Sequence, residues 1–272
     1  MREPIPPEQF RALIRAVCHD RYGKEEKNRF GEIEDWDVSR VEDMSHAFED
    51  CHDFNRDLSR WDTRRVTNMN SMFSCACCFN QPVGGWNVSR VTDMGGMFSG
   101  AWAFNQPLEG WNTCRVTNMP CMSFGARAFN QGLGNWNVSQ VTNMLSMFLA
   151  AETFNQPLDR WDVSRLKTAG FMFCSAVAFN QPLGNWDVSG VTYAPFMFQG
   201  AEAFDQSLEA WDVSSIPDRD RVTMFQELAR PPTTRWLPYD HPHTVWLRHR
   251  RSWRQGRIFR EETGTAGTAR AS

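Results

Sequence analysis

Apolar residues return in this chain with a period of 25 residues, and tryptophan makes the period visible. In most units an aliphatic residue precedes the indole by three positions and a valine follows it by two, giving L-x-x-W-x-V. Inward apolar residues that alternate with outward Asp, Asn or Ser have the period of a half-buried strand. The pattern therefore predicts one short parallel strand per unit. The eight tryptophans are Trp36, Trp61, Trp86, Trp111, Trp136, Trp161, Trp186 and Trp211.

A second apolar segment follows each tryptophan. It begins with a Val, Leu or Ile five residues after the indole, continues through a Met and a Met-Phe pair, and ends at an Ala. Steps of three and four residues are typical of one helical face. We therefore expect a short helix or 3-10 segment in each unit, with Met and Phe beneath it and Ala allowing neighbouring segments to approach.

Each unit closes with a turn of the type F-N-Q-P-L, as in Phe104-Asn105-Gln106-Pro107-Leu108. Proline cannot continue a helix, and it favours extension into the next segment. The asparagine recurs as a column, and a turn Asn commonly bonds backbone groups. We expect these side chains to bond the backbone, including that of the neighbouring unit.

Repeats of about 20 to 50 residues are typical of stacked arrays in which each unit buries its apolar side against its neighbours. The fold class predicted is an α/β repeat, a leucine-rich-repeat-like solenoid with one strand and one short helix per unit. Three regions are expected: a capping helix and approach segment over 1–29, about eight repeats over 30–229, and a basic segment over 230–272 whose end is disordered. Within the first region, an apolar helical face predicts the capping helix at residues 8–22.

The unit W-D-V-S-x-V-T-N-M-x-x-M-F-x-x-A-x-x-F-N-Q-P-L resembles the repeat of BspA-like leucine-rich repeat surface proteins, in the tryptophan-containing form of mycoplasma surface lipoproteins. The approach segment from Tyr22-Gly23 to Trp36 is also similar to that family. The resemblance implies a right-handed solenoid, display at the cell surface and adhesion to host or matrix proteins. No signal peptide or lipobox cysteine is seen in the sequence, which departs from that pattern.

Charge is distributed unevenly along the chain. Residues 230–272 contain nine arginines and three acidic residues, so this segment has a net charge of +6, while the whole chain has −3 and the remainder −9. Arginines interleaved with Trp236, Trp246 and Trp253 are compatible with binding to nucleic acid or another polyanion. A loosely attached cap is the simpler interpretation of this segment.

The eight cysteines occupy different phases of the repeat, so they do not form a ladder of disulfides. Cys51 and Cys77 fall one residue apart in phase on adjacent units, but small buried thiols are the preferred interpretation. With no apolar run long enough to span a membrane, the protein is expected to be cytoplasmic if its N-terminus is complete. It is expected at the cell surface or secreted if the family analogy holds.

The surface predicted to bind a partner lies beside the tryptophans. An Asp or Asn follows each indole directly, and an Arg follows it by four positions in five units. On parallel strands these residues would form polar columns along a concave face, which suits docking of a protein or peptide. Solvation and mutual pairing of the same residues are the competing interpretation. The residues are Asp37, Asp62, Asn87, Asn112, Asn137, Asp162, Asp187, Asp212, Arg40, Arg65, Arg90, Arg115 and Arg165.

No catalytic arrangement is apparent in the sequence. Its six histidines do not recur with Ser, Asp or Cys as a nucleophile, base and orienting group would, and no phosphate-binding glycine loop is present. We therefore expect a non-enzymatic, monomeric scaffold without cofactor or metal, which binds a protein or peptide on its concave strand face. The alternatives are a BspA-type adhesin displayed on the cell surface and a polyanion-binding protein acting through residues 230–272; nucleic acid is not the expected partner.

Overall fold

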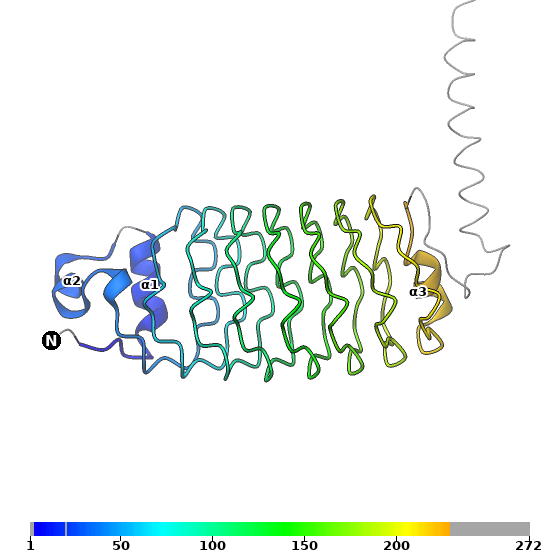
Figure 1. The fold of residues 1–272 in the computed structure, drawn as a ribbon. Helices are drawn as coiled ribbons and strands as arrows, with labels where there is room; N and C mark the ends of the chain where they lie inside the picture. Colours follow the sequence, from blue (N-terminus) through cyan, green and yellow to red (C-terminus); the bar gives the residue numbers. More distant parts are fainter. Residues whose placement is uncertain (1–2, 20, 229–272) are drawn as a thin grey trace, which may run out of the picture. The chain divides into compact units, whose positions relative to one another are not determined.

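The computed structural model describes residues 3–19 and 21–228, which belong to one compact unit, Met1–Thr234. Within that unit the repeats form a stack of coils in sequence order, each coil side by side with the next (Figure 1). We name each coil after its tryptophan. Helices α1 (Phe10–Cys18) and α2 (Lys24–Phe30) and the short 3-10 helix η1 (Ile33–Asp35) precede the coils, and helix α3 (Asp218–Thr223) follows the Trp211 indole.

The predicted strand at L-x-x-W-x-V is wrong, and with it the leucine-rich-repeat solenoid of strands and helices. Parallel pairing in the described residues consists of isolated bridges, from Asp43 with Asn68 to Thr168 with Tyr193, and builds no sheet. The segment around each indole turns instead of extending. In the Trp61 coil, Trp61 N–H donates to Leu58 at 3.1 Å and Val66 N–H donates to Thr63 at 3.0 Å. Two consecutive turns bury the same residues that a short strand would bury.

The predicted helix is also wrong in the coils from Trp36 to Trp186, whereas the Trp211 coil contains helix α3 in this segment. In the seven coils from Trp36 to Trp186, two positions have left-handed backbone, ten and fourteen residues after the tryptophan, as at Gly96 (φ 62°) and Gly100 (φ 67°). A left-handed residue interrupts an α-helix, which needs negative φ throughout. The segment forms repeated turns instead: Met97 N–H donates to Met94, and Ala101 N–H donates to Phe98. Because each turn spans three residues, side chains three or four positions apart point to the interior, as they do on one face of a helix.

Alternate N–H groups of this segment point to the next coil. Met94, Gly96 and Phe98 donate to Asn118, Pro120 and Met122 at 2.9, 2.7 and 2.9 Å. This ladder recurs along most of the stack, and it satisfies backbone groups that would otherwise be buried without partners. The coils are therefore joined mainly through the segment expected to be helical.

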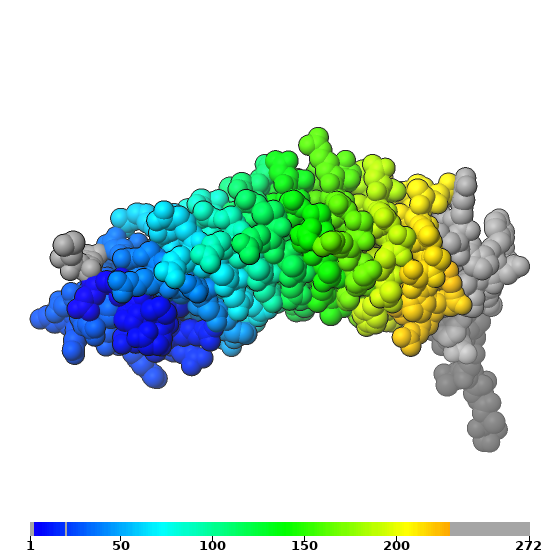
Figure 2. Space-filling view, turned by 90° about the horizontal axis from the view of Figure 1, so that it is seen from below, coloured from blue at the N-terminus to red at the C-terminus, as the bar shows by residue number. Residues whose placement is uncertain are grey.

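Aromatic side chains fill the interior in stacked columns. Trp61 and Trp86 stack with ring centroids 6.4 Å apart, and Phe79 and Phe104 stack at 6.0 Å. The eight tryptophans of the repeat are each only 3–4% exposed. Their predicted inward orientation is confirmed. Figure 2 shows the succession of coils from the outside, in sequence order from cyan to orange.

The asparagine column at the closing turn bonds the neighbouring coil, as predicted. Asn105 Oδ1 accepts the backbone N–H of Asn130 at 3.0 Å and the side-chain amide of Gln131 at 2.9 Å. The same arrangement runs from Asn55 to Asn180. Each Asn therefore holds the turn of the next coil in register.

The two ends of the stack are closed by different contacts. Helix α1 falls within the range 8–22 expected for a helix, and Phe10 in it packs edge-on against Trp61. A disulfide joins Cys18 of this helix to Cys51. At the other end, Asp220 is 3% exposed and accepts the backbone N–H of Ala194 at 3.3 Å. Its carboxylate thus takes the place of the backbone carbonyl that a following coil would supply.

Candidate functional site

The predicted site residues lie in the turn that follows each tryptophan. In every coil the Asp or Asn side chain uses Oδ1 to accept the backbone N–H two residues later, at 3.0–3.3 Å. This Asx turn fixes both the backbone and the direction of the side chain. The residues involved are Asp37, Asp62, Asn87, Asn112, Asn137, Asp162, Asp187 and Asp212.

Further hydrogen bonds hold some of these carboxylates in their charged form. The Ser164 hydroxyl donates to Asp162 at 2.7 Å, and this bond, followed by the backbone bond from Ser164, lowers the pKa of Asp162. The guanidinium of Arg64 pairs with Asp62 and lowers the pKa of that carboxyl. Asp62 is half-buried, and the other seven Asx residues of this column are exposed.

The arginines three residues further on are all exposed but differ in their partners. Arg65 forms an ion pair with Glu42 of the preceding coil, and Arg165 donates to Gln140 Oε1 at 2.6 Å. Within residues 3–19 and 21–228, Arg40, Arg90 and Arg115 form no ion pair or hydrogen bond through their side chains.

The Asx and Arg columns lie on the same face. The positive charge of Arg165 contributes to lowering the pKa of Asp162, so the two positions are neighbours within a coil. The bond from Arg165 to Gln140 links adjacent coils at the same position. We call these two columns the Asx–Arg face. Contrary to expectation, the face is built on turns and not on parallel strands.

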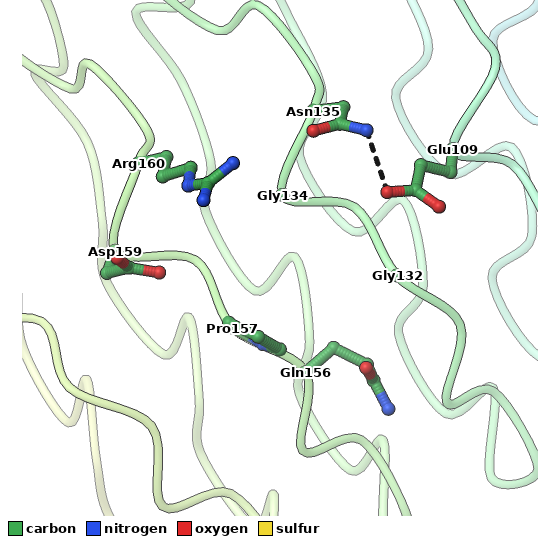
Figure 3. Close-up of a pocket in the computed structure, with 8 residues that line it drawn as sticks. All are labelled: Glu109, Gly132, Gly134, Asn135, Gln156, Pro157, Asp159 and Arg160. Carbon is green, nitrogen blue, oxygen red and sulfur yellow. Dashed lines mark hydrogen bonds between the residues drawn. The ribbon is translucent and has the colours of Figure 1, made fainter.

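A shallow polar pocket, which the sequence analysis missed, lies across the turns that precede Trp111, Trp136 and Trp161 (Figure 3). Its volume is about 460 Å³. Asn135 donates to Glu109 at 2.7 Å on one side, and Arg160 and Asp159 lie on the other. A Cβ at Gly134 would lie 3.3 Å from the carbonyl oxygen of Pro157, so glycine allows the close approach of these turns. In the sequence, the one sign of this pocket is Gly132, which stands where most units have a proline.

The cysteines are arranged differently from expectation. Cys51 pairs with Cys18 and not with Cys77, and the Cα atoms of the bridge lie 5.6 Å apart. The other six are exposed or half-buried, so the prediction of buried thiols is wrong for them. Among the described residues, no group of three His, Cys, Asp or Glu side chains is placed to hold a metal ion.

None of the helices in residues 3–19 and 21–228 has the length and apolar character needed to cross a bilayer. The basic segment 230–272 lies outside the described residues, so its predicted disorder and polyanion binding stay predictions.

A search among curated proteins finds no match. Two overlapping segments, residues 19–135 and 122–234, match a single family of repeat-containing proteins. Together they include every coil and therefore the whole Asx–Arg face. The chain belongs to the family described as "Mycoplasma protein of unknown function, DUF285".

Proposed function

We propose that this protein is a non-enzymatic scaffold that binds a protein or peptide on the Asx–Arg face. The observation that supports this most directly is the state of Arg40, Arg90 and Arg115, which are exposed and unpaired within the described residues. Unpaired guanidinium groups on a fixed backbone can bind carboxylates or carbonyl groups without first breaking an internal ion pair. The repeated turns hold such groups at regular intervals, which suits an extended partner.

A scaffold is favoured over an enzyme by the repetition itself. Acid–base catalysis needs two titratable groups whose environments differ enough to separate their pKa values. On the Asx–Arg face each carboxylate has nearly the same surroundings, an Asx turn beside a Ser or Arg. Such a surface offers many equal contacts and no distinct reacting centre.

The test is capture of a partner by the full chain and by a variant in which Arg40, Arg90 and Arg115 are all changed to Ala. We expect the wild type to retain a protein or peptide from a displayed library and the variant to lose it. Thermal unfolding must be unchanged, because the three side chains are exposed and their loss opens no cavity. Equal retention by both proteins would contradict the proposal.

A second function, adhesion at the cell surface as in BspA-type proteins, is favoured by the disulfide between Cys18 and Cys51. Disulfides persist mainly in oxidising surroundings such as the cell exterior. Protease treatment of intact cells tests this location: a displayed protein is cut, whereas a protein inside the cell is spared. In a parallel thiol-labelling experiment, Cys18 and Cys51 should react only after reduction.

A further inference from the structure

The outward chemistry of the Asx–Arg face changes between its central and its C-terminal coils. In every coil the Asx turn engages Oδ1, and in the coils other than that of Trp61, where Arg64 pairs with Asp62 Oδ2, the second terminal atom of the exposed side chain is available to a partner. In Asn87, Asn112 and Asn137 that atom is the amide nitrogen, which makes no hydrogen bond within the described residues. An amide nitrogen can only donate hydrogen bonds.

The same central coils contain two of the unpaired arginines, Arg90 and Arg115. A guanidinium group is also a donor only, and it is always charged. We call the five residues Asn87, Arg90, Asn112, Arg115 and Asn137 the donor strip. Its net charge is +2, and none of its outward groups is a hydrogen-bond acceptor apart from the Asn oxygens already engaged in the Asx turns.

The next coils present the opposite chemistry. Asp162, Asp187 and Asp212 use Oδ1 in the same Asx turn, which leaves Oδ2 outward as an acceptor. Position four after the tryptophan is no longer arginine in the last two of these coils, where it is Gly190 and Ser215. We call the three aspartates the acceptor strip.

We propose that the donor strip binds an acidic peptide segment, whose Glu or Asp carboxylates accept hydrogen bonds from Arg90 and Arg115 and from the neighbouring Asn amides. This inference rests on the proposed function and specifies the partner's chemistry. Carboxylates are the acceptors that guanidinium groups bind most closely among protein side chains. The neighbouring Asn residues are neutral, whereas an Asp at the same positions would compete with the peptide carboxylate for the arginine.

A peptide fits this arrangement better than a long polyanion. The part of the chain before residue 230 has a net charge of −9, and the acceptor strip adjoins the donor strip. A uniformly charged polymer following the stack would meet Asp162, Asp187 and Asp212 and be repelled. A peptide can place its acidic residues over the donor strip alone.

The test measures binding of a Glu-rich peptide, long enough to span the three central coils, to the full chain. A peptide with Gln in place of each Glu is the matched ligand, and heparin is the polyanion probe. We expect the Glu peptide to bind at least about tenfold more tightly than the Gln peptide at low salt, with affinity falling as salt screens the charges. Heparin binding to the full chain is expected not to depend on Arg90 and Arg115, since the acceptor strip repels a polyanion on this face.

The chain offers an unusually close pair of variants for this test. Asn87→Asp, Asn112→Asp and Asn137→Asp together keep every Oδ1 bond, since Asp occupies the equivalent position in five other coils. They turn outward donors into acceptors, and we expect Glu-peptide affinity to fall at least about tenfold. The reverse changes, Asp162→Asn, Asp187→Asn and Asp212→Asn, remove negative charge nearby and should leave affinity unchanged or raise it.

The outcomes separate this inference from the proposed function. Equal binding of the Glu and Gln peptides, with loss in Arg90→Gln/Arg115→Gln, would overturn the acidic partner while keeping the binding face. Tight heparin binding that depends on Arg90 and Arg115 would replace the peptide by a polyanion. If no peptide bound and no library member were retained through this face, both proposals would fail.

Discussion

The indole nitrogen of Trp136 donates a hydrogen bond to the backbone carbonyl of Leu108, 28 residues earlier, at 2.9 Å. The same carbonyl accepts the backbone N–H of Trp111 at 3.1 Å, so one oxygen closes its own turn and binds the next coil. Equivalent indole bonds reach from Trp61 to Ile33 and from Trp211 to Leu183. Tryptophan at this position therefore supplies a bond between coils that leucine could not make.

Replacing Trp136 separates the two contributions of the indole. Trp136→Ala removes a side chain that is 3% exposed, and we expect a loss of about 3–5 kcal/mol through the cavity it opens. Trp136→Phe keeps an aromatic ring in the column but loses the bond to Leu108, with an expected cost of about 1–3 kcal/mol. Urea unfolding followed by circular dichroism measures both. A Trp136→Phe variant as stable as the wild type would show that the hydrogen bond contributes nothing beyond packing.

The left-handed positions predict a second pair of variants. Gly125 has φ 64° and open space around its missing Cβ, so Gly125→Ala introduces backbone strain without a clash. We expect a loss of about 1–2 kcal/mol. Gly85 is the control, because its surroundings are equally open and its φ is not in the left-handed range. Gly85→Ala should leave the free energy of unfolding unchanged or raise it slightly; a loss equal to that of Gly125→Ala would contradict this explanation.

The carboxylates of the Asx turns predict sensitivity to acid. The pKa values of Asp62, Asp162 and Asp212 are lowered by bonds from the Arg64 side chain, the Ser164 hydroxyl and the Ser214 backbone, respectively. A lowered pKa in the folded state means that unfolding takes up protons in acid. The stabilisation is complete above the unfolded value of about 3.9 and is lost as pH falls through the folded value.

Changing all three aspartates to Asn tests this origin of the acid sensitivity. The amide oxygen keeps the Asx turn but carries no charge, so the variant should lose the charge-dependent stabilisation at neutral pH, and its stability should decline less steeply between about pH 5 and 3. Urea titrations at several pH values measure the slope. The matched control is Asp205→Asn in another turn, whose neighbour in the column, Asn180, is already an asparagine. An identical acid slope in the triple variant and the wild type would refute the assignment.

The disulfide between Cys18 and Cys51 ties α1 to the Trp36 coil across 33 residues. Closing a loop of this length restricts the unfolded chain, and the entropic model gives about 3–4 kcal/mol. Cys18→Ser and Cys51→Ser are each expected to lower the melting temperature and to abolish its response to a reductant. Cys114→Ser, a change at an exposed free thiol, should alter neither property. A wild type whose melting temperature ignores reductant would show that the bridge contributes nothing to stability.

Several features followed from the residues alone. The period of 25 positions, the inward tryptophans and the bonding role of the Asn column were all predicted correctly. The exposed Asx and Arg positions were also located, because an alternation of apolar and polar residues reports burial directly. What the pattern could not reveal was which arginines are unpaired, since the partners of Arg65 and Arg165 lie in other coils, at Glu42 and Gln140.

The path of the backbone within each coil was decided by tertiary structure. Burial spacing does not distinguish a helix from repeated turns, because both bring residues three and four apart to one side. The glycines at positions 96, 100, 125 and 200 were a local sign of left-handed backbone, but Ser, Cys, Ala and Phe adopt it in other coils. They do so because their N–H groups bond the next coil, as Ser71 N–H donates to the carbonyl of Gly95. The sequence by itself therefore determined which residues are buried and how often they recur, whereas the hydrogen bonds between neighbouring coils determined the conformation that buries them.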